Sequence, residues 1–292
     1  MPSEEMRAFN AQARAQMKPI FNANYDPAEA RGARGVSDVL KAESTFEDVG
    51  AARIEFRPGP ESDRLFAYVA GGGFCFGGDD NHRRLVDEIA IAAGARGCLI
   101  HHRLAPEAPF PAAFDDVSAA VSHLMERVGQ GGLVLGGDSS GGGLVLATVM
   151  ARLARGAAAP RGLVLLSTLS DLAMTGLSHV ANAEADPLFG PQAMIHKGHH
   201  YLQGANPTDP RVSPLWGDPT GLPPLLLIAG STEIMLDDSA RFHARARAHG
   251  VESQLTVYPE APHVFPLMEF PESKAARAEV QTFVASLWAG GS

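Results

Sequence analysis

Residues 133–142 read LVLGGDSSGG, a short apolar run followed by a serine between glycines. Residues 137–141 of this stretch fit the pattern G-x-S-x-G, with Ser139 at the centre. A serine hydroxyl is a poor nucleophile unless a sharp turn from a strand into a helix holds it exposed beside a base. Small residues on both sides of Ser139 allow such a turn, so the stretch predicts a nucleophile there.

The flanking sequence supports the turn. Residues 133–135 have the length and apolar character of a buried parallel strand, and the Ala- and Leu-rich residues after Gly143 predict a helix. The pattern by itself also fits an ordinary glycine-rich connection with no chemistry. The rest of the chain must therefore decide between the two interpretations.

Composition limits the class of protein. The chain has 292 residues, 45% of them hydrophobic, which is enough for one large α/β core. Its net charge of −9 and the absence of a Lys/Arg block give no reason to expect a nucleic acid or an anionic membrane as partner. No apolar stretch approaches the ~20 residues that span a bilayer. With two cysteines and an acidic N-terminus that has no apolar leader, we expect a cytoplasmic protein.

Apolar runs alternate with segments of helical periodicity along most of the chain. Such alternation predicts the α/β class, with a mostly parallel central sheet flanked by helices. A last helix, with Val280 and Val284 on its apolar face, should close the core. The expected strands cover residues 65–69, 98–100, 133–135, 163–166, 225–228 and 255–258.

Two segments stand outside this alternation. Residues 1–45 precede it, and the connection from 167 to 224 is far longer than usual and contains a predicted helix over 191–204. We therefore expect a catalytic domain made of residues 46–170 and 216–292. Residues 1–45 and 171–215 should form a small helical cap on it.

A serine nucleophile needs a base and a carboxylate that orients the base. Glu233 follows the run 225–228 and His263 follows 255–258, in the order serine, acid, histidine. Because the carboxyl ends of parallel strands meet at one edge of a sheet, these side chains should converge. Asp237 and Asp238 are alternative acids, but they fit better as first-turn charges of the next helix.

The tetrahedral oxyanion needs hydrogen-bond donors. Three glycines follow the expected strand 65–69 and offer unobstructed backbone N–H groups. The donors we expect are the N–H groups of Gly72, Gly73 and Ser140. A triple glycine alone is more often a flexible loop, so this prediction depends on the other members of the set.

Together these stretches resemble the bacterial hormone-sensitive lipase family (family IV esterases) of the α/β-hydrolase superfamily. The resemblance implies an α/β-hydrolase fold with a helical cap and a carboxylic-ester hydrolase activity. It also implies that Ser139 is the nucleophile, His263 the base, and the N–H groups named above the oxyanion hole. The stretches that carry it are residues 70–77, 102–113, 137–142, 213–233 and 263–265.

Two departures from the family pattern affect the site. Many members have Asp as the acid, where this chain has Glu233. The family's His-Gly-Gly-Gly begins here with Ala70, which cannot make side-chain hydrogen bonds that brace the glycine loop. We therefore expect a working but less rigid oxyanion hole. Arg103 and Glu107 match family positions that we interpret as structural.

The chemistry we expect is a two-step acyl transfer that needs no cofactor and no metal. His196, His199 and His200 have no carboxylate or cysteine at matching spacing, so we interpret them as polar surface. The apolar side chains near the site favour neutral esters with short to medium acyl chains. The expected substrate-binding residues are Phe74, Phe76, Asp138, Leu188, Phe189, Val264 and Phe265.

Two alternatives remain open at this stage. Residues 185–188, 201–202 and 209–210 resemble the branch that includes terpene-lactone hydrolases, so the same triad would serve a lactonase. Plant gibberellin receptors resemble this family but have lost the base, which suggests a catalytically silent small-molecule receptor; here His263 is present. The expected partner is in either case a small molecule, an ester or a lactone for an enzyme. A homodimer is left open.

Overall fold

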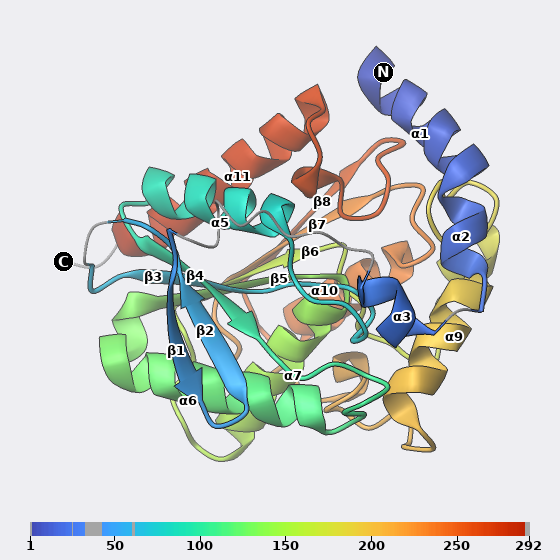
Figure 1. Cartoon of the computed structure of the whole chain (residues 1–292). Helices are drawn as coiled ribbons and strands as arrows, with labels where there is room; N and C mark the ends of the chain where they lie inside the picture. Colours follow the sequence, from blue (N-terminus) through green and yellow to red (C-terminus); the bar gives the residue numbers. More distant parts are fainter. Residues whose placement is uncertain (1, 25, 33–42, 60–61, 290–292) are drawn as a thin grey trace.

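The computed structural model describes residues 2–24, 26–32, 43–59 and 62–289 (Figure 1). One eight-stranded sheet organises this part of the chain, with the strand order β1-β2-β4-β3-β5-β6-β7-β8. The strands are β1 (Thr45–Val49), β2 (Ala52–Phe56), β3 (Leu65–Val69), β4 (Arg96–His101), β5 (Leu133–Asp138), β6 (Gly162–Leu166), β7 (Leu225–Gly230) and β8 (Ser253–Tyr258).

Strands β3 to β8 pair in parallel, whereas β2 pairs antiparallel with both β1 and β4. The six apolar runs are therefore strands, as predicted, and the α/β class is confirmed. The sequence pattern did not predict β1 and β2. The reason is visible in β2, where the fully buried Glu55 accepts hydrogen bonds from Arg83 at 2.7 and 2.8 Å. A strand that buries ion pairs does not show an apolar run.

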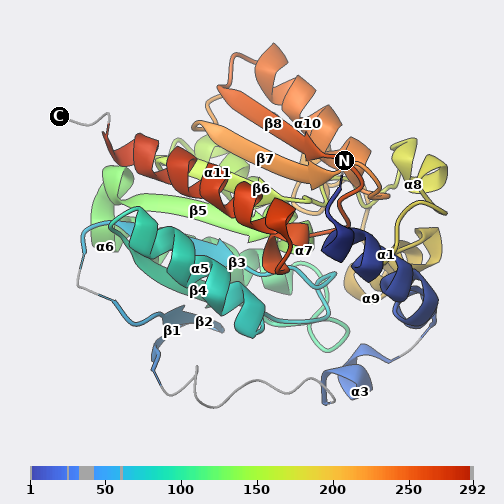
Figure 2. The same cartoon turned by 90° about the horizontal axis from the view of Figure 1, so that it is seen from above.

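Helices cover both faces of the sheet (Figures 1 and 2). On one face, α5 (Asp80–Ala92) and α11 (Pro271–Ala289) pack over Phe66 and Tyr68 of β3. On the other, α6 (Ala112–Gly132), α7 (Ser139–Ala154) and α10 (Leu236–Ala248) pack over Leu65, Ala67 and Val69 of the same strand. Since successive side chains of a strand point to opposite faces, two covered faces require unbroken apolar strands.

The turn from β5 into α7 explains the glycines of the opening stretch. Val69 of β3 lies opposite Gly137 of β5, so α7 begins directly beside the end of β3. A Cβ atom on Gly141 would lie 2.1 Å from the carbonyl oxygen of Val69, and one on Gly142 would lie 2.5 Å from Thr168 Oγ1. Only glycine permits this close approach of helix and sheet.

Of the remaining helices, α2 contacts α9 beside the sheet (Figure 1). The predicted helix over 191–204 is confirmed as α9, and residues 33–42 of the first expected cap segment lie outside the described residues. No helix in the described ranges is both long and apolar enough to cross a membrane. These elements are α1 (Glu4–Gln16), α2 (Lys18–Asn22), α3 (Pro27–Gly32), α8 (Ser178–Ala181), α9 (Pro191–Leu202) and the 3-10 turns η1 (Pro214–Trp216) and η2 (Phe265–Leu267).

Candidate active site

Ser139 is the first residue of α7 and follows β5 directly. Its φ of +50° lies in the left-handed region, which costs free energy for a non-glycine residue and persists only where the surroundings enforce it. Its carbonyl oxygen accepts a hydrogen bond of 2.9 Å from the N–H of Leu169. The sharp strand-to-helix turn predicted from the sequence is therefore present, and Ser139 lies on the wall of a cavity.

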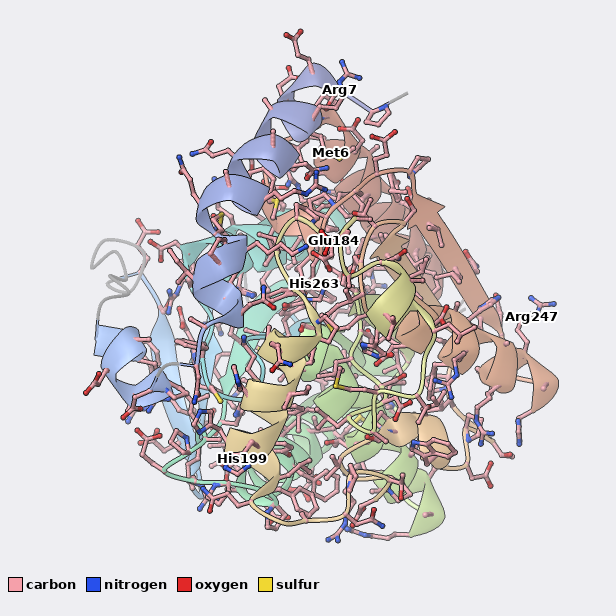
Figure 3. The ribbon with its side chains drawn as sticks, turned by 90° about the vertical axis from the view of Figure 1, so that its right-hand side faces the viewer. Met6, Arg7, Glu184, His199, Arg247 and His263 are labelled. Carbon is pink, nitrogen blue, oxygen red and sulfur yellow. The ribbon has the colours of Figure 1, made fainter. Side chains whose placement is uncertain are left out.

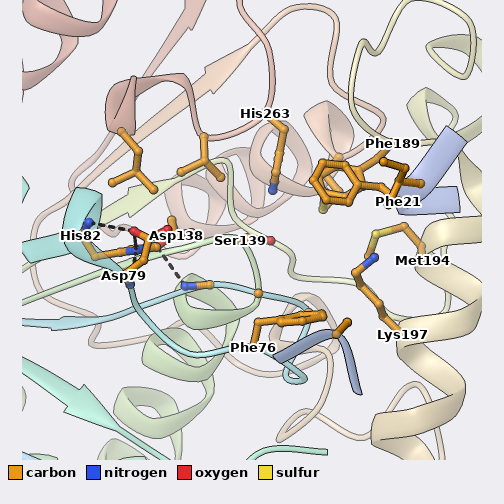
Figure 4. A pocket seen from close by; sticks show the side chains of 18 of the residues that line it. Phe21, Phe76, Asp79, His82, Asp138, Ser139, Phe189, Met194, Lys197 and His263 are labelled. Atoms are coloured by element: carbon orange, nitrogen blue, oxygen red, sulfur yellow. Dashed lines mark hydrogen bonds and ion pairs between the residues drawn. The ribbon is translucent and has the colours of Figure 1, made fainter. Parts of the chain in front are cut away.

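His263 and Glu233 lie together across from this serine. The Nδ1 atom of His263 is 2.8 Å from Oε2 of Glu233, and the Glu233 side chain is fully buried. The two residues follow β8 and β7, which are neighbours in the sheet. In Figure 4 a ring nitrogen of His263 is directed toward the hydroxyl of Ser139.

The buried carboxylate affects the protonation of His263. Burial by itself lowers the pKa of an imidazole, but the hydrogen bond and the charge of Glu233 outweigh burial here and raise the pKa of His263 above its ordinary 6.5. An Nδ1–H that donates to Glu233 leaves the opposite nitrogen free to accept a proton. The contact with Glu233 therefore makes His263 more basic than an ordinary histidine.

Ser167 is a member of this cluster that the sequence interpretation missed. Its hydroxyl donates to Oε1 of Glu233 at 2.7 Å and accepts from the backbone N–H of Val264 at 2.9 Å. The N–H of Gly230 also donates to Oε1 of Glu233. The sequence offered one sign of this role. Ser167 comes directly after the apolar run 163–166, just as Glu233 and His263 come shortly after the runs 225–228 and 255–258.

The two alternative acids point elsewhere. Asp238 is fully buried, lies 3.0 Å from Nε2 of His179, and accepts backbone N–H bonds from Ser170 and Asp171. Asp237 accepts from the N–H of Ser178 at 3.0 Å. Both stand in the first turn of α10, as predicted, and they anchor the segment 170–179 instead of His263.

The glycine loop after β3 is held at both ends by the neighbours of Ser139. Asp138 Oδ1 accepts the N–H of Gly71 at 3.0 Å, and Ser140 Oγ accepts the N–H of Phe74 at 3.2 Å. Between these bonds, Gly72 has a φ of +133° and Gly73 a φ of +62°, and both line the cavity with Ser139. This bracing needs no side chain at position 70.

The cavity has a volume of about 700 Å³. Four of the seven expected substrate-binding residues line it: Phe76, Asp138, Phe189 and Val264. The ring of Phe189 stands edge-on to the imidazole of His263, with centroids 5.2 Å apart and an interplanar angle of 80°. The cavity wall beside His263 is therefore aromatic.

The expectation is wrong for the other three residues, which are buried and do not line the cavity. Phe74 has a φ of +63° and stacks on Tyr201 of α9, with ring centroids 3.8 Å apart. Phe265 is fully buried, and its ring centroid is 4.9 Å from that of Tyr258. Leu188 is buried beside Phe189, which takes the place at the wall.

Several wall residues were not expected. Lys197 of α9 lies against Gly73, and its ammonium is 5.2 Å from the ring centroid of Phe189, so the cavity is not lined by uncharged groups alone. Figure 3 shows His263 near the centre of the molecule and His199 well apart from it on α9. The additional wall residues are Pro19, Ile20, Phe21, Ala23, Ala30, Gly71, Asp79, His82, Met194, Lys197, Met235 and Leu267.

Arg103 and Glu107 have structural contacts, as interpreted. Arg103 donates to the buried Asp116 through Nε at 2.9 Å and Nη2 at 2.7 Å. Glu107 pairs with Arg31 of α3, whose Nη1 also donates to the carbonyl oxygen of Cys75 at 2.8 Å. The second pair ties α3 to the loop that carries Phe76.

Comparison with known proteins agrees with this geometry. Residues 66–267 match the family model of the alpha/beta hydrolase fold. An acetyl-hydrolase of Streptomyces hygroscopicus is 36% identical over 246 residues, which cover 82% of this chain and 80% of that protein.

Solved structures are similar over nearly the whole chain. A crystal of EstE5 soaked with p-nitrophenyl butyrate gives a TM-score of 0.88 at 32% identity, covering 99% of this chain and 100% of that one. An esterase from the bacterial hormone-sensitive lipase family gives a TM-score of 0.84 at 33% identity, covering 99% of both chains. Such relatives favour an enzyme over a silent receptor. The chain belongs to the bacterial hormone-sensitive lipase family of the α/β hydrolases and is a serine carboxylic-ester hydrolase.

Proposed function

We propose that this enzyme hydrolyses neutral carboxylic esters of short to medium acyl length through Ser139, His263 and Glu233. The observation that carries the proposal is the His263–Glu233 contact of 2.8 Å, made at the wall of the cavity that also contains Ser139. A base held by a buried carboxylate beside a serine on a strained turn is the arrangement that acyl transfer requires.

In the proposed mechanism His263 accepts the proton of Ser139 as its Oγ attacks the ester carbonyl carbon. The backbone N–H groups of Gly72, Gly73 and Ser140 stabilise the oxyanion that forms. His263 then gives the proton to the departing alcohol, and an acyl-enzyme remains. Water, deprotonated by the same imidazole, releases the acid and restores the free serine.

The preference for short to medium acyl chains is supported by the size and the lining of the cavity. Its volume of about 700 Å³ suits a small ester, and the rings of Phe21 and Phe189, with centroids 5.3 Å apart, form an apolar part of its wall. The Streptomyces relative is an acetyl-hydrolase, and EstE5 crystals were soaked with a butyrate ester. Both names fit short acyl groups.

We further propose that residues 1–45 and 171–215 form a small helical cap on a catalytic domain of 46–170 and 216–292. Supporting this, Phe21 of α2 and Met194 of α9 both line the cavity. Lys18 Nζ also donates to the carbonyl oxygen of Asp186 at 2.7 Å, which ties the two segments together. The ends of the second segment, at Leu172 and Leu215, pack into the core of the sheet.

The test is a series of p-nitrophenyl esters from acetate to palmitate, measured with the wild type, Ser139→Ala and Ser286→Ala. The proposal expects the butyrate ester to be hydrolysed faster than the palmitate ester and Ser139→Ala to be inactive. Ser286, whose hydroxyl bonds within α11 to the carbonyl oxygen of Phe283, is the matched control and should keep full activity. Faster turnover of seven-membered lactones than of any linear ester would instead establish a lactonase.

A further inference from the structure

Asp138 has a second partner besides the glycine loop. Its Oδ1 accepts the N–H of Gly71 and also lies 3.3 Å from Nε2 of His82. His82 stands in the first turn of α5, is only 6% exposed, and lines the cavity (Figure 4). None of the steps derived above uses this histidine.

The other ring nitrogen of His82 faces a second carboxylate. Nδ1 lies 2.8 Å from Oδ1 of Asp79, the N-cap residue of α5. The backbone N–H of Asp79 also donates to Nδ1, at 3.1 Å, which completes the capping box of α5. The negative charges of the two carboxylates favour the charged form of the imidazole. Burial lowers the pKa of His82, but the charges and hydrogen bonds of Asp138 and Asp79 outweigh it and raise the pKa to about 9. The two aspartates therefore favour the charged form of His82.

The groups that face His82 come from three elements. Asp79 lies at the start of α5, Asp138 at the end of β5, and the ring of Tyr68 on β3 has its centroid 6.3 Å from that of His82. Burial raises the pKa of Tyr68 well above 10, so this phenol stays neutral. Arg83, the next residue on α5, turns away and donates to Glu55. The charge balance at His82 is thus set by the two aspartates.

Asp138 has only 3% of its surface exposed, so its side chain depends on the polar partners around it. It also lies flat against the loop, since a Cβ atom on Gly71 would be 2.2 Å from Oδ2 of Asp138. A carboxylate turned away from this orientation would lose the N–H of Gly71, the residue before the expected oxyanion donors.

We propose that His82 is a positioning residue for the oxyanion loop: its contact with Asp138 keeps that carboxylate in the orientation that accepts the N–H of Gly71, and so keeps Gly72 and Gly73 aimed at the oxyanion. This inference rests on the proposed function, because it assigns a role within the same acyl-transfer site. A residue with this role stabilises the transition state more than it strengthens substrate binding, whereas a residue that only stabilises the fold would not have this selective effect.

The test uses His82→Gln with p-nitrophenyl butyrate and with a short-chain alkyl trifluoromethyl ketone. The ketone forms a reversible hemiketal with the serine, whose oxyanion occupies the hole. Because misplacement of catalytic groups lowers the rate of chemistry, kcat should fall roughly tenfold and ketone affinity by a similar factor, with KM within about twofold of wild type. Unchanged kcat and ketone affinity in a folded His82→Gln enzyme would overturn the proposal.

A second variant keeps the test decisive if His82→Gln does not fold. Asp79→Asn retains an N-cap side chain of equal quality but removes one of the two negative charges at His82. The wild-type kcat should decline at alkaline pH with a midpoint near the His82 pKa of about 9, and Asp79→Asn should move this decline to lower pH. An alkaline limb at the same pH in both enzymes would refute the role of His82.

Two further variants distinguish a failure of the positioning role from a failure of the proposed function. His101 makes a comparable contact, with Nε2 2.8 Å from Oε2 of the buried Glu55, but it does not line the cavity. His101→Gln should leave kcat and ketone affinity unchanged; an equal loss there would reduce the effect of His82 to general stability and contradict the proposal. An inactive Ser139→Ala beside an unaffected His82→Gln would refute only the positioning role, whereas an active Ser139→Ala would refute the proposed function itself.

Discussion

The hydroxyl of Ser167 donates to the carboxylate of Glu233 at 2.7 Å. Ser167 follows β6, Glu233 follows β7, and the same hydroxyl accepts the N–H of Val264, next to His263 after β8. One side chain thus connects the ends of three neighbouring strands. It leaves Oε2 of Glu233 to His263 and satisfies a buried backbone N–H beside the proposed base.

Replacement of Ser167 by Ala should lower kcat roughly tenfold with little change in KM. A hydrogen bond to a charged group is typically worth about 1.5–3 kcal/mol, and its loss lets the Glu233 carboxylate rotate away from Nδ1 of His263. Steady-state kinetics on p-nitrophenyl butyrate provides the measurement. Ser286→Ala is the control, and a Ser167→Ala enzyme with wild-type kcat would show that Gly230 alone orients the acid.

The variants Glu233→Gln and Asp238→Asn distinguish the two buried carboxylate–histidine pairs. Glu233→Gln should reduce kcat by about 10³- to 10⁴-fold, because His263 loses the acceptor that fixes its tautomer. Asp238→Asn should cost about 1–3 kcal/mol of unfolding free energy, since it weakens the contact with His179, while kcat stays within about twofold of wild type. Steady-state kinetics and denaturant titration measure the two effects. If Asp238→Asn lost the activity and Glu233→Gln lost only stability, Asp238 would be the acid.

Substitution of Gly72 by Ala should abolish most of the activity. A Cβ atom there would lie 2.5 Å from the carbonyl oxygen of Phe76, and the φ of +133° is one that other residues rarely adopt. Gly50 also has a positive φ, +63°, but has no atom within 4 Å of an added Cβ. Gly50→Ala should therefore cost about 1–2 kcal/mol of stability and leave kcat unchanged. Equal activities of the two variants would show that the glycine loop is not part of the site.

The raised pKa of His263 predicts the acid limb of the pH profile. A general base works in its neutral form, so kcat/KM should fall as the pH drops through the pKa of His263. Because Glu233 raises this pKa, the midpoint should lie above the ordinary value of 6.5. In the residual activity of Glu233→Gln the midpoint should move to lower pH. Hydrolysis of a non-ionising ester between pH 5 and 9 measures the midpoints of the wild type and of Glu233→Gln. Equal midpoints would show that Glu233 does not raise the pKa of His263.

His82 also makes stability depend on pH. Its folded pKa of about 9 exceeds the ordinary 6.5, so its contribution is fully present below pH 6.5 and is lost as the pH rises toward 9. The expected loss is at most about 3 kcal/mol. Urea titrations at pH 6 and pH 9 should show a smaller pH dependence for His82→Gln than for the wild type. An identical dependence would mean that His82 is not charged in the folded state.

The order of the site residues and the apolar runs allowed much of this site to be predicted. Long unbroken runs indicate strands buried on both faces, and parallel strands place the residues that follow them at one edge. The pairing of Glu233 with His263 agrees with that reasoning. The antiparallel β2 was missed because it balances its buried Glu55 with arginine, which a hydropathy pattern cannot show. The edge strand β1 was missed because its side chains are largely exposed and form no apolar run.

The sequence by itself determined the α/β fold, the sharp turn at Ser139 and the expected chemical roles around it, because strand-forming runs and turn glycines are local properties of the chain. Only the tertiary structure decided which side chains form the cavity wall and which hold the site in place. Three contacts show this: Lys197 lies against Gly73, Ser167 donates to Glu233, and His82 lies beside Asp138. Each contact joins two residues that are far apart along the chain. Their contacts depend on how helices pack on the sheet, and no local pattern encodes that packing.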